Sequence, residues 1–298
     1  MTPRTSAAYP GSAGTATRAE RIALAVFYGF TIASVAGYAV FGLHPELLAQ
    51  TPSAIAVYSV AFTFFPRAHV ALAFATLALV LVGRAGLRWL PAFAACYALS
   101  LGSELAGTTV GLPFGAYSYG PGLGMKWFGH VPVLIPLSWF FMAVPSYLLA
   151  RQALPERARA TLTGRATVVL GGSLVLLAWD LALDPAMSWI TRYWVWGEVG
   201  PYYGMPLLNL FGWYVTGLVL MGALATLGAD AWGESLPKRW LLGYYGANLL
   251  LPLGMIAAAG MWFGVIVSLL AVGASLWLPR LHDRFVGVEV EPVVQEAA

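Results

Sequence analysis

Two stretches, Glu104-Leu-Ala-Gly-Thr-Thr-Val-Gly-Leu-Pro-Phe-Gly-Ala-Tyr-Ser-Tyr119 and Asp180-Leu-Ala-Leu-Asp184-Pro185, set carboxylates at the ends of long apolar runs. A charged side chain at the centre of a bilayer costs about 2.5–3.5 kcal/mol on insertion scales. Because charged residues make up 10% of this chain, acidic side chains inside apolar runs depart from its general avoidance of charge. These stretches predict a membrane fold and mark candidate functional residues.

Composition places the chain among polytopic membrane proteins. Its 298 residues are 59% hydrophobic, and the mean hydropathy is +0.74. We predict an all-α bundle of about eight transmembrane helices in the cell membrane. The net charge of +3 is spread through loops without a basic, aromatic-rich cluster, so no nucleic-acid partner is expected.

Apolar runs divide the chain into spans and two tails. We expect a disordered tail over 1–19, one transmembrane domain over 20–280 and a polar tail over 281–298. The second run is long and is interrupted by Pro66 and Arg67, which predicts a kinked or broken helix, or a surface helix followed by a span. The eight expected spans are 21–42, 54–83, 89–107, 131–150, 166–184, 206–228, 239–257 and 259–279.

The distribution of basic residues predicts the orientation of these spans. With the N-terminus in the cytoplasm, inside segments carry thirteen Lys and Arg residues and outside segments carry two. This asymmetry follows the positive-inside rule and places both termini in the cytoplasm. It also places Glu104, Asp180 and Asp184 towards the extracytoplasmic leaflet, beside the long outside segments 108–130 and 185–205.

The two aspartates are spaced for acid chemistry. Asp180 and Asp184 are four residues apart and share a helical face, and Pro185 favours a helix end beside them. Two carboxylates this close cannot both ionise cheaply in a dry site, so one can donate a proton while the other remains its partner. The alternative is structural, with Asp184 bonded to loop backbone and Asp180 to a neighbouring helix.

Glu104 precedes a segment of irregular backbone. Glycines and prolines recur through 107–124, between which lie Tyr117 and Tyr119. Irregular backbone at membrane depth is tolerated where it lines a cavity or is buried in protein. The segment is therefore either a cavity wall or a plain extramembrane loop, and Glu104 is either a site residue or a structural hydrogen-bond partner.

The segment 189–214 is rich in aromatic side chains. Trp194, Trp196 and Tyr203 are candidates to line a pocket for an apolar polyene or a transient cation, and a membrane-interface belt is the alternative. Asn209 could orient a water or bond a carboxylate, and a structural role is equally compatible with its position.

Metal and disulfide chemistry are not expected. Cys96 is the only cysteine, and the four histidines are far apart in sequence. We therefore predict no disulfide and no metal site.

Five ordered blocks together resemble the carotenoid 1′,2′-hydratase family, which includes bacterial γ-carotene hydratases and archaeal bisanhydrobacterioruberin hydratase. The resemblance covers roughly 20–280. The blocks are Glu104-Leu-Ala-Gly-Thr, Gly111-Leu-Pro-Phe-Gly-Ala-Tyr-Ser-Tyr119, Val131-Pro-Val-Leu-Ile-Pro-Leu-Ser-Trp139, Ala182-Leu-Asp-Pro185 and Tyr203-Gly-Met-Pro-Leu-Leu-Asn-Leu-Phe-Gly-Trp213.

The resemblance implies cofactor-independent addition of water across the terminal 1′,2′ double bond of an acyclic carotenoid end, giving a tertiary alcohol. It implies lycopene- or γ-carotene-like substrates drawn from the bilayer, products that feed deinoxanthin- or myxol-like pigments, and other enzymes of the pathway as candidate partners.

The chemistry of the candidate residues fits such a reaction. Asp184 or Asp180 is our candidate proton donor, and Glu104 is the alternative donor or the base that activates water. Tyr117, Tyr119, Trp194, Trp196 and Tyr203 are candidates to line the cavity.

Two other functions remain open from the sequence. Asp180-Leu-Ala-Leu-Asp184 is half of an aspartate-rich Mg²⁺-diphosphate motif, as in an intramembrane prenyltransferase, whose second acidic cluster could include only Asp230 and Glu234. Intramembrane acids also serve proton coupling, so a transporter or a non-enzymatic carotenoid-binding protein is the other alternative.

Overall fold

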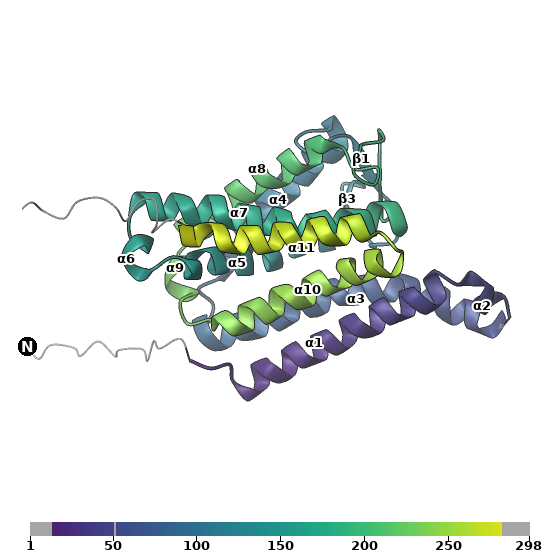
Figure 1. Ribbon diagram of the computed structural model, residues 1–298, viewed down its shortest axis with the longest axis horizontal. Helices are drawn as coiled ribbons and strands as arrows, with labels where there is room; N and C mark the ends of the chain where they lie inside the picture. The colour runs from purple at the N-terminus through teal and green to yellow at the C-terminus, as the bar shows by residue number, and fades with distance from the viewer. Residues whose placement is uncertain (1–13, 51, 282–298) are drawn as a thin grey trace, which may run out of the picture.

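A computed structural model describes residues 14–50 and 52–281 as a bundle of helices (Figure 1). A helix covers most of each of the eight expected spans. Among the described residues, six helical segments are long and apolar enough to cross a membrane, while α4 and the 16-residue α11 fall outside that set. The count of eight spans therefore stays a prediction. The long helices are α1 (Arg18–Gly37), α3 (Pro52–Ala85), α4 (Leu90–Val110), α5 (Leu134–Ala153), α7 (Leu162–Asp184), α8 (Leu207–Thr226), α10 (Lys238–Ala258) and α11 (Trp262–Trp277).

Short elements close the two ends of the bundle. Figure 1 shows β1 and β3 at one end, and α6 and α9 at the other. The fold is mostly helical, as expected, but two small antiparallel ribbons, β1–β4 and β2–β3, add strands that an all-α fold lacks. Strands β1, β2 and β4 lie in the expected outside segments, and β3 occupies the first two residues of the expected span 131–150. The short elements are α2 (Pro45–Ala49), α6 (Glu156–Arg159), α9 (Ala229–Trp232), η1 (Tyr38–Gly42), η2 (Pro185–Ile190), η3 (Leu278–Leu281), β1 (Tyr117–Tyr119), β2 (Lys126–Trp127), β3 (Val131–Pro132) and β4 (Trp194–Trp196).

Helices α5 and α7 form the centre of the bundle. Every residue from 139 to 150 of α5 is buried, and α7 packs against α5, α8, α10 and α11. Inside α10, Pro252 cannot donate to the Asn248 carbonyl, and the indole Nε1 of Trp179 donates to that oxygen at 3.3 Å. A side chain from α7 thus satisfies the backbone group that the proline leaves free.

The first helix begins at Arg18, one residue before the expected end of the N-terminal tail. Thr17 accepts from the Glu20 amide at 3.2 Å, and the Glu20 carboxylate accepts from the Thr17 amide at 2.7 Å, which is a capping box. Glu20 also pairs with Arg84 at 2.6 Å, so the start of α1 is fixed to the end of α3. Residues 1–13 and 282–298 of the expected tails lie outside the described residues.

Helix α3 runs through Pro66 as one continuous helix of 34 residues. Proline removes the hydrogen bond to the carbonyl four residues earlier, which is that of Phe62. The Tyr193 hydroxyl donates to the Phe62 oxygen at 3.1 Å and replaces the missing bond. The run is therefore neither a broken helix nor a surface helix followed by a separate span, which are two of the forms that the sequence allows.

The α-helical part of α7 ends at Asp184, as Pro185 predicts, but the chain continues through Pro185 into the π-helix η2. The carbonyl that Pro185 leaves free is that of Leu181, and it accepts from the Tyr202 hydroxyl at 2.8 Å. Burial raises the pKa of Tyr202 to about 12, so this phenol stays protonated and donates at neutral pH.

Candidate functional site

A small cavity brings most of the candidate residues together at the end of the bundle that carries the β1–β4 ribbon. Glu104 enters it from α4, Asp184 from the end of α7 and Asn209 from the first turn of α8. The cavity has a volume of about 30 Å³, which is room for roughly one water molecule. It is lined by Glu104, Phe114, Tyr117, Tyr119, Ile135, Ser138, Trp139, Leu183, Asp184, Trp194, Trp196, Asn209 and Trp213.

Glu104 is buried and is surrounded by donors. Its Oε1 accepts from Trp139 Nε1 at 2.8 Å, and its Oε2 accepts from the hydroxyls of Tyr119, at 2.7 Å, and Tyr117. Three aromatic donors on one carboxylate offset part of the cost of burying its charged form, because hydrogen bonds to a carboxylate are stronger than those to a neutral group. The arrangement suits a base or an electrostatic partner of a cation.

The β1–β4 ribbon sets four aromatic rings on one face. Tyr117 pairs with Trp196 and Tyr119 with Trp194, and alternate residues of a strand share a face. The ring centroids of these two pairs are 5.3 Å and 5.8 Å apart. Burial, and then the charge of Glu104, raise the pKa of both tyrosines well above its usual value, so both remain donors.

The two aspartates meet at Asn209. Its Nδ2 donates to Oδ2 of Asp184 and, at 3.0 Å, to Oδ2 of Asp180. The other Asp184 oxygen accepts from Trp194 Nε1 at 2.7 Å, whereas Oδ1 of Asp180 is buried without a partner among the described residues. Asp184 lines the cavity and Asp180 lies one helical turn deeper, as the spacing predicts.

Two residues of the site carry signals that the sequence interpretation did not use. Trp139 and Trp213 stack with centroids 4.0 Å apart, and both line the cavity. Each closes one of the quoted sequence blocks. Burying the N–H of a tryptophan without an acceptor costs free energy, and Glu104 is the acceptor for Trp139.

Tyr203 lies apart from the cavity, contrary to our expectation. Its hydroxyl accepts from the Gly264 amide at 3.1 Å, at the start of α11. Its backbone has a φ of 51°, in the left-handed region, and its ring packs edge-on against Tyr202 with centroids 5.1 Å apart.

Within the part of the chain that the structure describes, a second acidic site, which a prenyltransferase would need, is not assembled beside these acids. Asp230 accepts from the Tyr147 hydroxyl at 2.7 Å and pairs with Arg151 at 3.1 Å. Figure 1 shows its helix, α9, at the opposite end of the bundle from β1. Within 14–50 and 52–281, no three His, Cys, Asp or Glu side chains are grouped so that they could hold a metal ion.

Comparison with known proteins gives a family for the chain. The model of a family described as carotenoid biosynthesis protein matches residues 65–274. The chain is 32% identical over 216 residues to the bisanhydrobacterioruberin hydratase of Haloarcula japonica, covering 65% of this chain and 70% of that protein. No solved structure matches the chain.

Proposed function

The chain belongs to the carotenoid biosynthesis protein family, and on this premise we propose that it adds water across the terminal 1′,2′ double bond of an acyclic carotenoid. A relative named as a hydratase supports this activity. The observation that carries the proposal is the cavity in which Asp184, held by Asn209 beside Asp180, faces the donor-surrounded Glu104.

The first step is transfer of a proton to the alkene. The proton adds to C2 of the end group, the π bond breaks, and a tertiary cation forms at C1. Asp184 is the donor because it lines the cavity. Asp180 lies one helical turn deeper and accepts from the same Asn209 amide. Two negative charges this close and this dry repel strongly, so the pair carries one charge and one transferable proton.

The second step is capture of the cation by water. A water oxygen bonds to C1 and its surplus proton passes to a base. When that proton returns to Asp184, the enzyme is regenerated and the net change is one water added to give a tertiary alcohol. Glu104 is the base in this scheme, because its oxygens are held in place by three aromatic donors. A cavity of about 30 Å³ admits about one water, which limits competing reactions.

The cation between these steps needs stabilisation that the isolated double bond does not supply. Trp139, Trp194, Trp196 and Trp213 line the cavity, and a cation placed over an aromatic face gains about 0.5–2 kcal/mol. The neighbouring Glu104 charge adds electrostatic stabilisation in a site of low dielectric constant.

We place the protein in the cell membrane with the cavity towards the extracytoplasmic side. The six long apolar helices support the membrane location. The basic segments 151–165 and 238–239 adjoin α6 and α9, at the end opposite β1, which supports cytoplasmic termini under the positive-inside rule.

Expression in a host that accumulates lycopene tests the proposal. We expect a product heavier than lycopene by one water, formed without added cofactor. A product extended by an isoprenyl group and dependent on Mg²⁺ would indicate the prenyltransferase alternative. Unchanged pigment mass, with the protein present in the membrane, would contradict the hydratase proposal and favour a carrier.

A further inference from the structure

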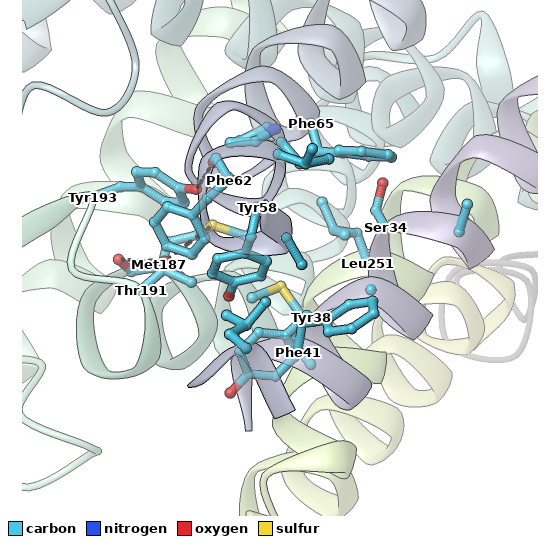
Figure 2. A pocket seen from close by; sticks show the side chains of 18 of the residues that line it. Ser34, Tyr38, Phe41, Tyr58, Phe62, Phe65, Met187, Thr191, Tyr193 and Leu251 are labelled. Carbon is cyan, nitrogen blue, oxygen red and sulfur yellow. Dashed lines mark hydrogen bonds between the residues drawn. The ribbon is translucent and has the colours of Figure 1, made fainter. Parts of the chain in front are cut away.

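A large apolar groove adjoins the acid cavity. It has a volume of about 570 Å³, within the range of ligand pockets, and lies between α1, α3, η2 and α10. Figure 2 shows Tyr38, Tyr58, Phe62, Met187 and Tyr193 around the space. The acid cavity of about 30 Å³ is too small for an isoprenoid end and the chain attached to it, so a substrate must lie mostly elsewhere.

Side chains on one face of α1 and one face of α3 form much of the groove. On α3 its lining residues are spaced at three and four, as one face of a helix requires. Ala54, Val57, Tyr58, Ala61, Phe62 and Phe65 make this stripe. A flat conjugated chain matches such a wall because aromatic rings present both apolar area and π faces.

One segment separates the groove from the acid cavity. At the end of α7, Asp184 faces the acid cavity, while Met187, in the following turn, faces the groove. Further along, the neighbours Tyr193 and Trp194 face the groove and the acid cavity, respectively. The two spaces therefore share a wall one backbone thick, with the proposed proton donor at its edge.

We propose that this groove binds the polyene chain of the carotenoid, with the reacting end group at the edge of this wall, where Asp184 lies. The inference rests on the proposed function for the identity of the polyene. The Tyr193 ring stacks on Phe62 with centroids 5.9 Å apart, and its hydroxyl donates to the Phe62 carbonyl. This contact fixes the groove and the acid cavity relative to each other.

The test uses a matched pair of substitutions on α3. Ala61→Trp places an indole in the groove, whereas Ala56→Trp places it on an exposed position of the same helix that does not line the groove. Each full-length variant is expressed with lycopene and purified, and the retained carotenoid is measured by absorption alongside product mass, thermal unfolding and co-purifying phospholipid.

We expect Ala61→Trp to reduce retained carotenoid and product by about tenfold or more, equivalent to at least about 1.4 kcal/mol of binding, and Ala56→Trp to change neither. Equal retention in the two variants, high or low, would overturn the proposal. Loss of phospholipid with carotenoid retained would assign the groove to lipid and also overturn it. Retention that follows the expected pattern while wild type forms no heavier product would refute the hydratase proposal and leave the groove standing.

Discussion

Asn209 is the residue on which the acid pair depends. Its single amide nitrogen donates to both aspartates, and it lies on α8 while they lie on α7. Removing one partner leaves buried carboxylate oxygens without a donor, which costs about 1–3 kcal/mol or more for charged groups. Asn209 is therefore a positioning residue for Asp184.

Substituting each aspartate in turn tests which of the two donates the proton. Asp184→Asn removes the transferable proton, and loss of a general acid lowers rates by about 10²–10⁴-fold. Asp180→Asn keeps the proton donor, so a smaller loss of turnover is expected. Product formation in membranes, normalised to folded protein, measures both. Wild-type turnover in Asp184→Asn would remove this residue from the donor role.

A matched asparagine tests the role of Asn209. Asn248 is also buried, but its Nδ2 donates to the Tyr244 carbonyl within α10, away from the acids. We expect Asn209→Ala and Asn248→Ala to lose similar thermal stability, about 1–3 kcal/mol each. Turnover should fall much further in Asn209→Ala, with KM little changed, and equal turnover in the two variants would refute the positioning role.

At the scale of residues, the sequence predicts the acids better than their partners. Glu104, Asp180 and Asp184 are visible because a carboxylate in an apolar run is expensive. Trp139 and Trp213 cannot be identified in this way, because tryptophan is common at many positions in membrane proteins. Only the folded structure shows which indole contacts which carboxylate.

At the scale of elements, the approach of β1 to α4 depends on Gly107. A Cβ there would lie 2.8 Å from the rings of Phe114 and Tyr117, so Gly107→Ala forces Tyr117 away from Glu104. Gly102, on the same helix, has no atom within 4 Å of such a Cβ. We expect Gly102→Ala to be neutral or stabilising by up to about 1 kcal/mol, since alanine favours helix.

Turnover measured beside thermal unfolding gives the comparison. Gly107→Ala should lose most activity while Gly102→Ala keeps it. If both variants hydrate the substrate equally well, the contact between Tyr117 and Glu104 is not needed for the reaction.

The elements that the sequence does not predict are those that depend on distant partners. The β1–β4 ribbon pairs Tyr117–Tyr119, which precedes α5, with Trp194–Trp196, which follows α7. No local sequence pattern predicts a pairing between segments so far apart. Likewise, Pro66 signals a helix break, yet Tyr193, more than a hundred residues later, supplies the donor that keeps α3 continuous.

At the scale of the whole molecule, the orientation of the bundle can be tested with cysteines. Cys96 is buried, so the wild-type protein should give little background labelling. Val199 is 90% exposed near the ribbon end, and Glu234 is exposed beside α9. An impermeant thiol reagent should label Val199→Cys in intact cells and Glu234→Cys only after permeabilisation; the reverse pattern would invert our topology.

Hydropathy and the distribution of basic residues thus predict the positions of the eight long helices. They do not predict the groove between α1, α3 and η2, because its shape depends on how those helices pack rather than on how apolar each one is.

Three of the prolines that lie within continuous helical segments have an evolutionary consequence. Pro66, Pro185 and Pro252 each leave a carbonyl without its backbone donor, and an aromatic side chain from elsewhere in the fold donates to it: Tyr193 for Pro66, Tyr202 for Pro185 and Trp179 for Pro252. Once the proline mutates, the backbone amide can bond that carbonyl, and the aromatic donor loses its purpose. Among homologues, each proline and its aromatic donor should therefore be conserved or lost together. An alignment in which the two positions vary independently would contradict this expectation.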